Sequence, residues 1–391
     1  MPAWLRPHLL ANHYPALHGL RVLAILTIVQ LHVTMGFRKW GFPPPQPWYD
    51  RSVSIWFGMD LFFLLSGFLI GSMLLRDADA TRPANAARFW ARRAFRIIPP
   101  YYVVLTALTL APITSPAQRA NVWHEYLYVT NYLPFRTEPV MLWAWSLCVE
   151  EHFYFAVPVV LAAVAALKTP GRRLGALVAL WASGVILRVA FVATHGPWTF
   201  EGLIREVYGR THLRYDILVA GVILAELQHR HGERVRAALD DRRWRAASWA
   251  VIGVCLALLL WPPAVIPEAA RWSVWWGVLT ALMYGPLVLM LVNRDTPLAR
   301  FLGARAFLVL ATFGYGVYLV HIPVGDYVVV PAVLLVGVAL LRAGVVLPAW
   351  LVWSVALALT WGVSVLLAYA LHVVVERPSL ALRDRVVPGR A

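Results

Sequence analysis

The chain has 391 residues, of which 60% are hydrophobic and only 14% are charged, and its mean hydropathy is +0.64. A soluble domain is about 45–50% apolar and about 25% charged, so this composition excludes an ordinary soluble protein and predicts a polytopic membrane protein. The formal net charge of +15 does not indicate a nucleic-acid-binding protein, because the basic residues cluster in short stretches between apolar segments, as in cytoplasmic loops.

Apolar segments long enough to cross about 30 Å of hydrocarbon predict about ten transmembrane helices and an all-α fold. They are residues 17–37, 53–75, 97–113, 143–167, 174–194, 213–228, 246–266, 272–292, 307–325 and 346–375. The third and the sixth are short. A further apolar stretch, residues 327–341, is either a re-entrant segment or an extension of the ninth helix.

Basic residues follow predicted spans two, four, six, eight and ten. The stretches are residues 82–96, 168–173, 230–245, 294–305 and 377–390. The positive-inside rule therefore predicts that the N-terminus and the C-terminus both lie in the cytoplasm. No cleavable signal peptide is evident, so we expect the first span to act as the signal anchor. We expect residues 1–391 to form a single transmembrane domain.

A histidine and an arginine lie within the first apolar segment. Arg21 and His32 are eleven positions apart, which on a helix places both side chains on one face, about 16 Å apart along the axis. Ionisable side chains inside a membrane span are costly and usually face the interior of a helix bundle or a water-filled cavity, so each is a candidate for a functional site.

The predicted topology places further polar side chains near the depth of His32. Spans two, four and nine contribute a serine, a histidine and three carboxylates at similar depth: Asp60, Ser66, Glu150, Glu151 and His321. Random placement would seldom bring these residue types to one depth on four helices. The sequence therefore predicts a polar functional site inside the membrane.

Each of these residues also has a simpler explanation. His321 is either a catalytic residue or a helix–helix hydrogen-bonding group, and Asp60 could only cap a helix or pair near the interface. Ser66, with the glycine after it, could form a small-residue packing surface. Only one of Glu150 and Glu151 can face a given neighbour, and the other would pair with an arginine or reach the headgroups.

Six segments, spread over nearly the whole chain, carry distinctive patterns. They are LHGLR with the histidine eleven positions after its arginine (17–32), GMDLFFLLSGFLIG (58–71), FWARRAFRIIPPYY (89–102), WSLCVEEHFYF (145–155), FGYGVYLVHIPV (313–324) and ERP (376–378). In this order they resemble the acyltransferase-3 family of bacterial integral-membrane O-acyltransferases. Two positions depart from the family pattern: His152 stands where Gln is common, and Gly314 or Gly316 where Ser is common. Neither touches the Arg–His pair, but acceptor choice could differ.

The resemblance implies transfer of an acyl group, usually acetyl, from cytoplasmic acyl-CoA to a hydroxyl, often of a sugar, at the bacterial cytoplasmic (inner) membrane. Such proteins modify lipopolysaccharide O-antigen, exopolysaccharides, peptidoglycan or secreted natural products such as macrolides. We therefore expect acetyl-CoA as the donor co-substrate, a hydroxyl-bearing glycan or small molecule as the acceptor, and the lipid bilayer as the surroundings. No permanently bound cofactor or metal is expected, since Cys148 and Cys255 are too few for a four-ligand zinc site.

The intramembrane residues suit that chemistry. A hydroxyl is a weak nucleophile and needs a base within about 3 Å, a role that fits His32 because an imidazole titrates near neutral pH. A carboxylate beside the ring would hold its tautomer, with Glu150 as the first candidate and Glu151 as the second. Ser66 or Tyr315 could hydrogen-bond the developing oxyanion.

Arginines on two segments are candidates for binding the donor. Arg21 lies closer to the cytosol than His32 and could bind phosphate or pantetheine groups. Arg92, Arg93 and Arg96 could hold the nucleotide phosphates at the membrane surface, because guanidinium forks suit phosphate geometry. Alternatively, these three arginines only fix the orientation of the chain.

Two other classes of protein share some of these features. A proton-coupled transporter or flippase would also bury histidines and carboxylates in about ten spans, but no inverted repeat and no paired Gly/Pro-broken helices are evident in the sequence. A membrane scaffold would leave the buried ionisable residues without a purpose. The sequence therefore favours the acyltransferase interpretation.

Overall fold

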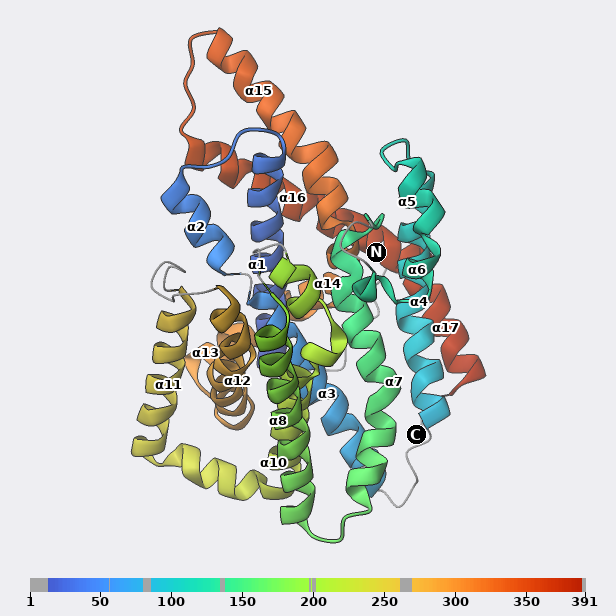
Figure 1. The fold of residues 1–391 in the computed structure, drawn as a ribbon, viewed down its shortest axis with the longest axis vertical. Coiled ribbons are helices and arrows are strands. Elements are labelled where there is room, and N and C mark those ends of the chain that lie inside the picture. Colours follow the sequence, from blue (N-terminus) through green and yellow to red (C-terminus); the bar gives the residue numbers. More distant parts are fainter. Residues whose placement is uncertain are drawn as a thin grey trace. The chain divides into compact units, whose positions relative to one another are not determined.

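Long apolar segments form helices because a backbone inside a membrane must satisfy its hydrogen bonds internally. The computed structural model describes residues 13–55, 57–79, 86–133, 138–196, 198, 202–260 and 269–388, and every regular element in these ranges is helical (Figure 1). The chain divides into two compact units, each described by itself. Unit 1 comprises Met1–Met59, Pro99–Tyr101 and Pro297–Val386, and unit 2 comprises Asp60–Ile98, Tyr102–Thr296 and Val387–Ala391.

Unit 1 combines the N-terminal and C-terminal helices of the chain. Its helices are α1 (Pro15–Lys39), α2 (Gln46–Ser54), α13 (Pro297–Leu302), α14 (Arg305–Val324), α15 (Val330–Arg342), α16 (Ala349–Leu371) and α17 (Arg377–Val386). Two π-helical turns, Gly325–Val329 and His372–Glu376, join α14 to α15 and α16 to α17.

Close packing of α14 against α1 and α16 forms the centre of unit 1. A Cβ added at Gly314 would lie 2.5 Å from Cδ1 of Ile25, and one at Gly316 would lie 2.8 Å from Cβ of Ala368. Glycine at position 316 permits this close approach of α14 to α16, because the atoms that a Cβ there would meet are Cβ and Cα of Ala368. At the C-terminal end of α1, Lys39 Nζ pairs with Asp326 of the first π-helical turn at 3.0 Å. These contacts fix α1 beside α14.

Unit 2 contains the middle of the chain. Its longer helices are α3 (Gly58–Asp79), α4 (Ala86–Leu110), α7 (Trp145–Ala165), α8 (Pro170–Thr194), α10 (Tyr215–Asp240), α11 (Arg242–Leu260) and α12 (Ala269–Asn293). The shorter elements are α5 (Pro116–Asn121), α6 (Trp123–Tyr126), the 3₁₀ turns Thr130–Tyr132, Leu142–Ala144 and Thr211–Leu213, and the π-helical turn Leu203–Tyr208.

The core of unit 2 lies around α10, which packs against α8 and α12. Gly67 on α3 and Gly221 on α10 mark a further crossing, where a Cβ on either residue would overlap the backbone of the other helix. Helix α10 is kinked at His231, next to Gly232, where φ is −127° and ψ is 21°. Figure 1 shows the second part of α10 turning away after this kink and leading into α11.

Eight described helical segments are long and apolar enough to cross a membrane, which confirms an all-α polytopic membrane protein. They are Pro15–Lys39, Gly58–Asp77, Leu142–Ala165, Pro170–Thr194, Arg242–Leu260, Trp275–Asn293, Arg305–Arg342 and Ala349–Val386. Eight of the ten predicted spans coincide with them, although residues 261–266 of the predicted seventh span lie outside the described residues. The cytoplasmic location of both termini stays a prediction.

The predicted third and sixth spans are helices too, but they differ from the prediction in extent. Helix α4 begins at Ala86, well before residue 97, and so includes the arginine cluster that the sequence analysis placed in a loop. Helix α10 continues to Asp240 and includes several arginines. The sequence windows missed these extensions because a membrane-span criterion rejects segments rich in charge, whereas helices tolerate arginine well.

The apolar stretch 327–341 extends the ninth predicted helix. The chain is helical from Arg305 to Arg342 through the π-helical turn that follows Pro323. These 38 residues correspond to about 57 Å at 1.5 Å per residue, longer than the roughly 30 Å hydrocarbon core. The segment therefore either tilts strongly or extends past the hydrocarbon.

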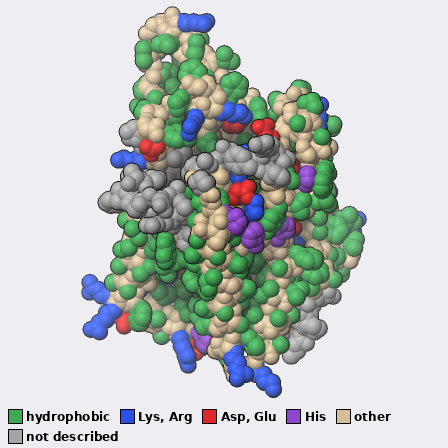
Figure 2. Space-filling view, viewed as in Figure 1, with side chains coloured by type: hydrophobic (Ala, Val, Ile, Leu, Met, Phe, Trp, Pro, Cys, Tyr) green, Lys and Arg blue, Asp and Glu red, His purple; other side chains and the backbone are tan. Residues whose placement is uncertain are grey.

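The surface has the character expected for contact with lipid. Figure 2 shows apolar side chains over much of the face that is drawn, and large apolar residues such as Ile186 on α8 and Val254 on α11 are exposed. Lys and Arg gather at the lower edge of this face, near the α7–α8 and α10–α11 connections of unit 2. Positive charge at helix ends is the pattern on which the predicted orientation rests.

Candidate functional site: an intramembrane histidine pair and a serine–glutamate cluster

In unit 1, His32 on α1 contacts His321 on α14. Nε2 of His321 lies 3.0 Å from Nδ1 of His32, and the two ring centroids are 5.0 Å apart. His321 is fully buried, whereas His32 is half-buried. The structure thus joins two of the predicted site residues through the packing of two transmembrane helices.

In unit 2, Ser66 on α3 contacts Glu150 on α7. The Ser66 hydroxyl donates a hydrogen bond to Oε1 of Glu150, which also accepts one from the Tyr154 hydroxyl at 3.0 Å. The hydroxyls of Ser66 and Tyr154 are 3.4 Å apart. Because the one hydrogen of the Ser66 hydroxyl is directed at a carboxylate, the oxygen has lone pairs for a further ligand.

Glu150 and Glu151 have different surroundings. Glu150 accepts hydrogen bonds from Ser66 and Tyr154. Glu151 lies close enough to Glu150 and to Arg93 of α4 for their charges to act on its carboxylate. The guanidinium of Arg93 also lies over the Tyr154 ring, 5.1 Å from its centroid. That one carboxylate faces the site while the other pairs with an arginine or reaches the headgroups stays a prediction. The predicted pairing of Glu150 with His32 stays a prediction.

The remaining predicted residues are distributed over both units. Arg21 lies half-buried on α1 and Tyr315 half-buried on α14, both in unit 1. Arg92 and Arg96 lie half-buried on α4 in unit 2, where Nη1 of Arg92 donates to the Val387 carbonyl at 2.6 Å. The proposed contacts of these arginines with an anionic donor stay predictions.

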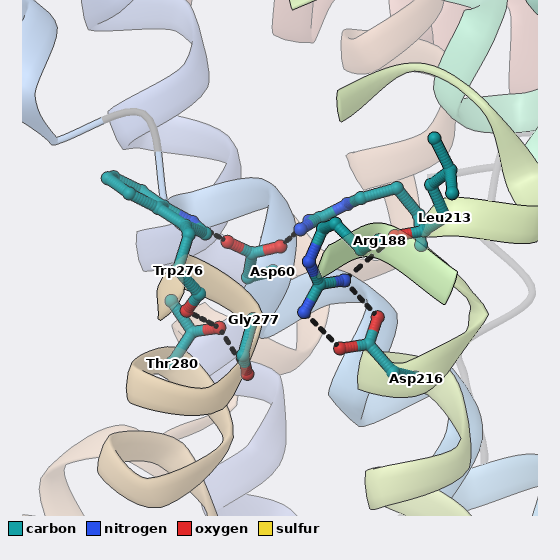
Figure 3. Close-up of polar contacts among 8 residues, drawn as sticks. Asp60, Arg188, Leu213, Asp216, Trp276, Gly277 and Thr280 are labelled. Carbon is teal, nitrogen blue, oxygen red and sulfur yellow. Dashed lines mark hydrogen bonds and ion pairs between the residues drawn. The ribbon is translucent and has the colours of Figure 1, made fainter. Parts of the chain in front are cut away.

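Asp60 belongs to a separate network of buried charges in unit 2 (Figure 3). Its carboxylate accepts hydrogen bonds from Arg214 and from the indole N–H of Trp276. A second pair lies next to it, in which Arg188 of α8 donates to both carboxylate oxygens of Asp216 of α10, at 2.9 and 2.8 Å. These four charged side chains are at most 1% exposed. Asp60 is thus a member of a buried ion pair.

The family model described as an acyltransferase domain (acyltransferase-3) matches residues 14–369. The chain belongs to the acyltransferase-3 family. The O-acetyltransferase OatA of Staphylococcus aureus (strain NCTC 8325 / PS 47) is 25% identical over 339 residues, which cover 80% of this chain and 51% of OatA. A second S. aureus protein (strain COL), named provisionally as an O-acetyltransferase, is 29% identical over 231 residues, 55% of this chain and 35% of its own length. No solved structure matches the chain.

The chain therefore spans about half the length of the curated relatives it matches. The acyltransferase-3 match includes the helices that carry both polar clusters, and it ends within α16, before the π-helical turn His372–Glu376 and α17. The histidine pair and the serine–glutamate cluster are thus features of the acyltransferase-3 domain itself.

Sequence reasoning missed some buried polar residues of this acyltransferase-3 domain. Arg188 lies within the apolar run GVILRVAFV of the fifth predicted span, so the criterion that selected His32 should have selected Arg188 as well. Tyr154 lies one helical turn after Glu150, a spacing that places the two on one face of α7. Arg214 and Asp216 precede or begin α10 and gave no signal, because charged residues near a span's end are ordinary.

Proposed function

We propose that the protein is an integral-membrane O-acyltransferase of the bacterial cytoplasmic membrane. It moves an acyl group, acetyl in the first instance, from acyl-CoA to a hydroxyl of a carbohydrate of the cell envelope or of a secreted glycan. The observation that carries the proposal is the contact of His32 with His321 inside an acyltransferase-3 domain. Buried imidazoles between apolar helices are costly, which favours a chemical role over a packing role.

In the proposed reaction, His32 is the general base. Its ring removes the proton of the acceptor hydroxyl as the oxygen attacks the carbonyl carbon of the thioester. The tetrahedral intermediate then collapses, the C–S bond breaks, and the thiolate of CoA takes the proton from the His32 imidazolium. The ester and free CoA leave, and His32 returns to its neutral form.

The donor approaches from the cytoplasmic side in this proposal. Arg21 is on the face of α1 that carries His32, about 16 Å nearer the N-terminal end of the helix. That spacing suits a long donor whose thioester reaches His32 while its phosphates contact arginine. Arg92, Arg93 and Arg96 on α4 are the candidates for the nucleotide phosphates, and Ser66 or Tyr315 for the oxyanion.

The test is acyl transfer by purified protein in lipid nanodiscs, with radiolabelled acetyl-CoA and membrane glycan extracts as acceptor. We expect His32→Gln to lower the rate by about 10²–10⁴-fold, the usual contribution of a general base, without lowering the melting temperature. His195→Gln is the matched control, because His195 is exposed at the end of α8. Full activity of His32→Gln would refute the general-base role.

Two further measurements separate the alternatives. Acetyl-CoA should raise the thermal stability of an acyltransferase, whereas a proton-coupled transporter or flippase would not respond to it. Mass spectrometry of envelope glycans and secreted small molecules, with and without the gene, should show the loss of one acetyl substituent. If only a macrolide-like product loses its acetyl group, the acceptor is that product and not a carbohydrate.

A further inference from the structure

The hydrogen bonds of the histidine pair form a chain whose direction can be worked out. His321 contacts a backbone carbonyl at one ring nitrogen and His32 at the other. From this chain we infer that His321 is a positioning residue, which fixes His32 as the Nδ1–H tautomer and makes Nε2 of His32 the basic atom. The inference rests on the proposed function and adds to it the reacting atom and the group that selects this atom.

The first step is the protonation of His321. Its Nδ1 lies 2.7 Å from the carbonyl oxygen of Tyr318, one turn earlier on α14. A carbonyl oxygen can only accept a hydrogen bond, so Nδ1 of His321 carries the hydrogen. A neutral imidazole has one N–H, and Nε2 of His321 is then an acceptor.

The second step transfers this constraint to His32. Because Nε2 of His321 accepts, Nδ1 of His32, 3.0 Å away, must donate. The backbone of Ile28, one turn earlier on α1, also lies near the His32 ring. Nε2 of His32 is left with its lone pair.

The alternative direction requires a charged His321. If both nitrogens of His321 carried hydrogens, Nδ1 of His32 could accept, and Nε2 of His32 would be blocked by its own hydrogen. An imidazolium at that position would be 1% exposed and beside a second imidazole. Burying a charge in such surroundings costs far more than burying a neutral ring, so the neutral chain is the stable one.

The two rings differ in access as this assignment requires. His321 is fully buried, while His32 keeps part of its surface. The ring that reacts is the more accessible one, and the ring that orients it is buried. In the reaction, Nε2 of His32 takes the hydroxyl proton and later gives it to the thiolate, while the Nδ1–H bond to His321 persists throughout.

An imidazole in the wrong tautomer cannot act as base at the required atom. In serine proteases, an Asp→Asn change that leaves the geometry intact but reverses the tautomer lowers kcat by about 10⁴-fold. His321 occupies the place of that aspartate, as a neutral acceptor. We therefore expect the loss of the acceptor at position 321 to lower kcat strongly while the KM for acetyl-CoA stays unchanged.

The test compares His321→Gln with His321→Leu in nanodiscs. The glutamine side chain can bring its amide oxygen near the position of Nε2 and accept from His32, whereas leucine fills a similar volume without an acceptor. We expect His321→Leu to lower kcat by about 10²–10⁴-fold and His321→Gln to retain most of it. Equal impairment of both variants at unchanged melting temperature, or full activity of His321→Leu, would overturn the inference.

A spectroscopic measurement is independent of activity. In protein labelled with ¹⁵N-histidine, the resonances of His32 are assigned by their loss in His32→Gln, and we expect a protonated Nδ1 and an unprotonated Nε2. A protonated Nε2 would overturn the inference. If His32→Gln is inactive while His321→Leu is fully active, the proposed function stands and the inference fails. If His32→Gln is fully active, the base role fails, and the spectrum alone decides the tautomer.

Discussion

Removal of one partner of the buried ion pair between Arg188 and Asp216 is expected to destabilise unit 2 strongly. Both side chains are 0% exposed, and two hydrogen bonds of 2.9 and 2.8 Å join them. Asp216→Asn removes the negative charge at nearly constant volume. Hydrogen bonds to charged groups contribute about 1.5–3 kcal/mol each, and breaking a buried pair by removing one partner costs about 3–5 kcal/mol. We therefore expect Asp216→Asn to lower the free energy of unfolding by about 3–5 kcal/mol.

The assay is reversible unfolding in mixed detergent micelles, followed by tryptophan fluorescence. Asp240→Asn is the matched control, because Asp240 pairs with Arg294 at the surface and is 74% exposed, so its loss should cost at most about 1 kcal/mol. The double change Arg188→Met with Asp216→Leu should recover much of the loss, since a buried pair is often replaceable by apolar residues. A change within about 1 kcal/mol for Asp216→Asn, or a double variant less stable than Asp216→Asn, would refute the reasoning.

Two further predictions concern neighbouring features. A Cβ at Gly277 would lie 2.7 Å from Oδ2 of Asp216 and 2.8 Å from Nη2 of Arg188, so we expect Gly277→Ala to lower the melting temperature. Gly285→Ala is the control and should leave the melting temperature unchanged, because a Cβ at Gly285 would have no contact below 3.6 Å. Equal changes in melting temperature for the two variants would contradict this prediction. Burial raises the pKa of Glu125 to about 7, so the folded state takes up a proton between the ordinary value of 4.5 and about 7, and stability should fall as pH rises through that window. Glu125→Gln should remove this pH dependence of the melting temperature, and a dependence unchanged in the variant would assign it to another group.

The helical fold was predictable because its signal is local. An apolar segment such as 349–371 or 15–39 leaves helix as the only way to satisfy its backbone in lipid. The limits of the helices were less predictable where charge enters them, as in α4. There the arginines favour a loop by hydropathy but are good helix formers by propensity. The division into two units had no local signal, since it depends on which helices pack together.

The candidate site was predictable in its residue types and less so in its partners. His32 and Glu150 can be recognised as candidates from the sequence alone, because each interrupts an apolar run and an ionisable side chain inside a membrane is costly. The partner of each is a matter of helix rotation, which spacing within one helix does not fix. Chemistry favoured a carboxylate as the partner of His32, and the structure has a second imidazole in contact with it. The hydrogen bond from Tyr154 to Glu150 was not predicted from the sequence and is seen only in the structure.

The contrast between the two kinds of buried polar group supports a chemical role for the histidines. In the network of Figure 3, each charged side chain pairs with one of opposite charge. Asp60 also accepts a hydrogen bond from Trp276, and Asp216 accepts two from Arg188. Each buried charge is therefore neutralised within the network, as in a structural ion-pair cluster. The His32–His321 chain is directional instead: it begins at a carbonyl, passes through two rings and ends at a lone pair on the more accessible ring. A packing role would be filled as well by two apolar side chains, whereas an oriented lone pair within the membrane is what a general base requires.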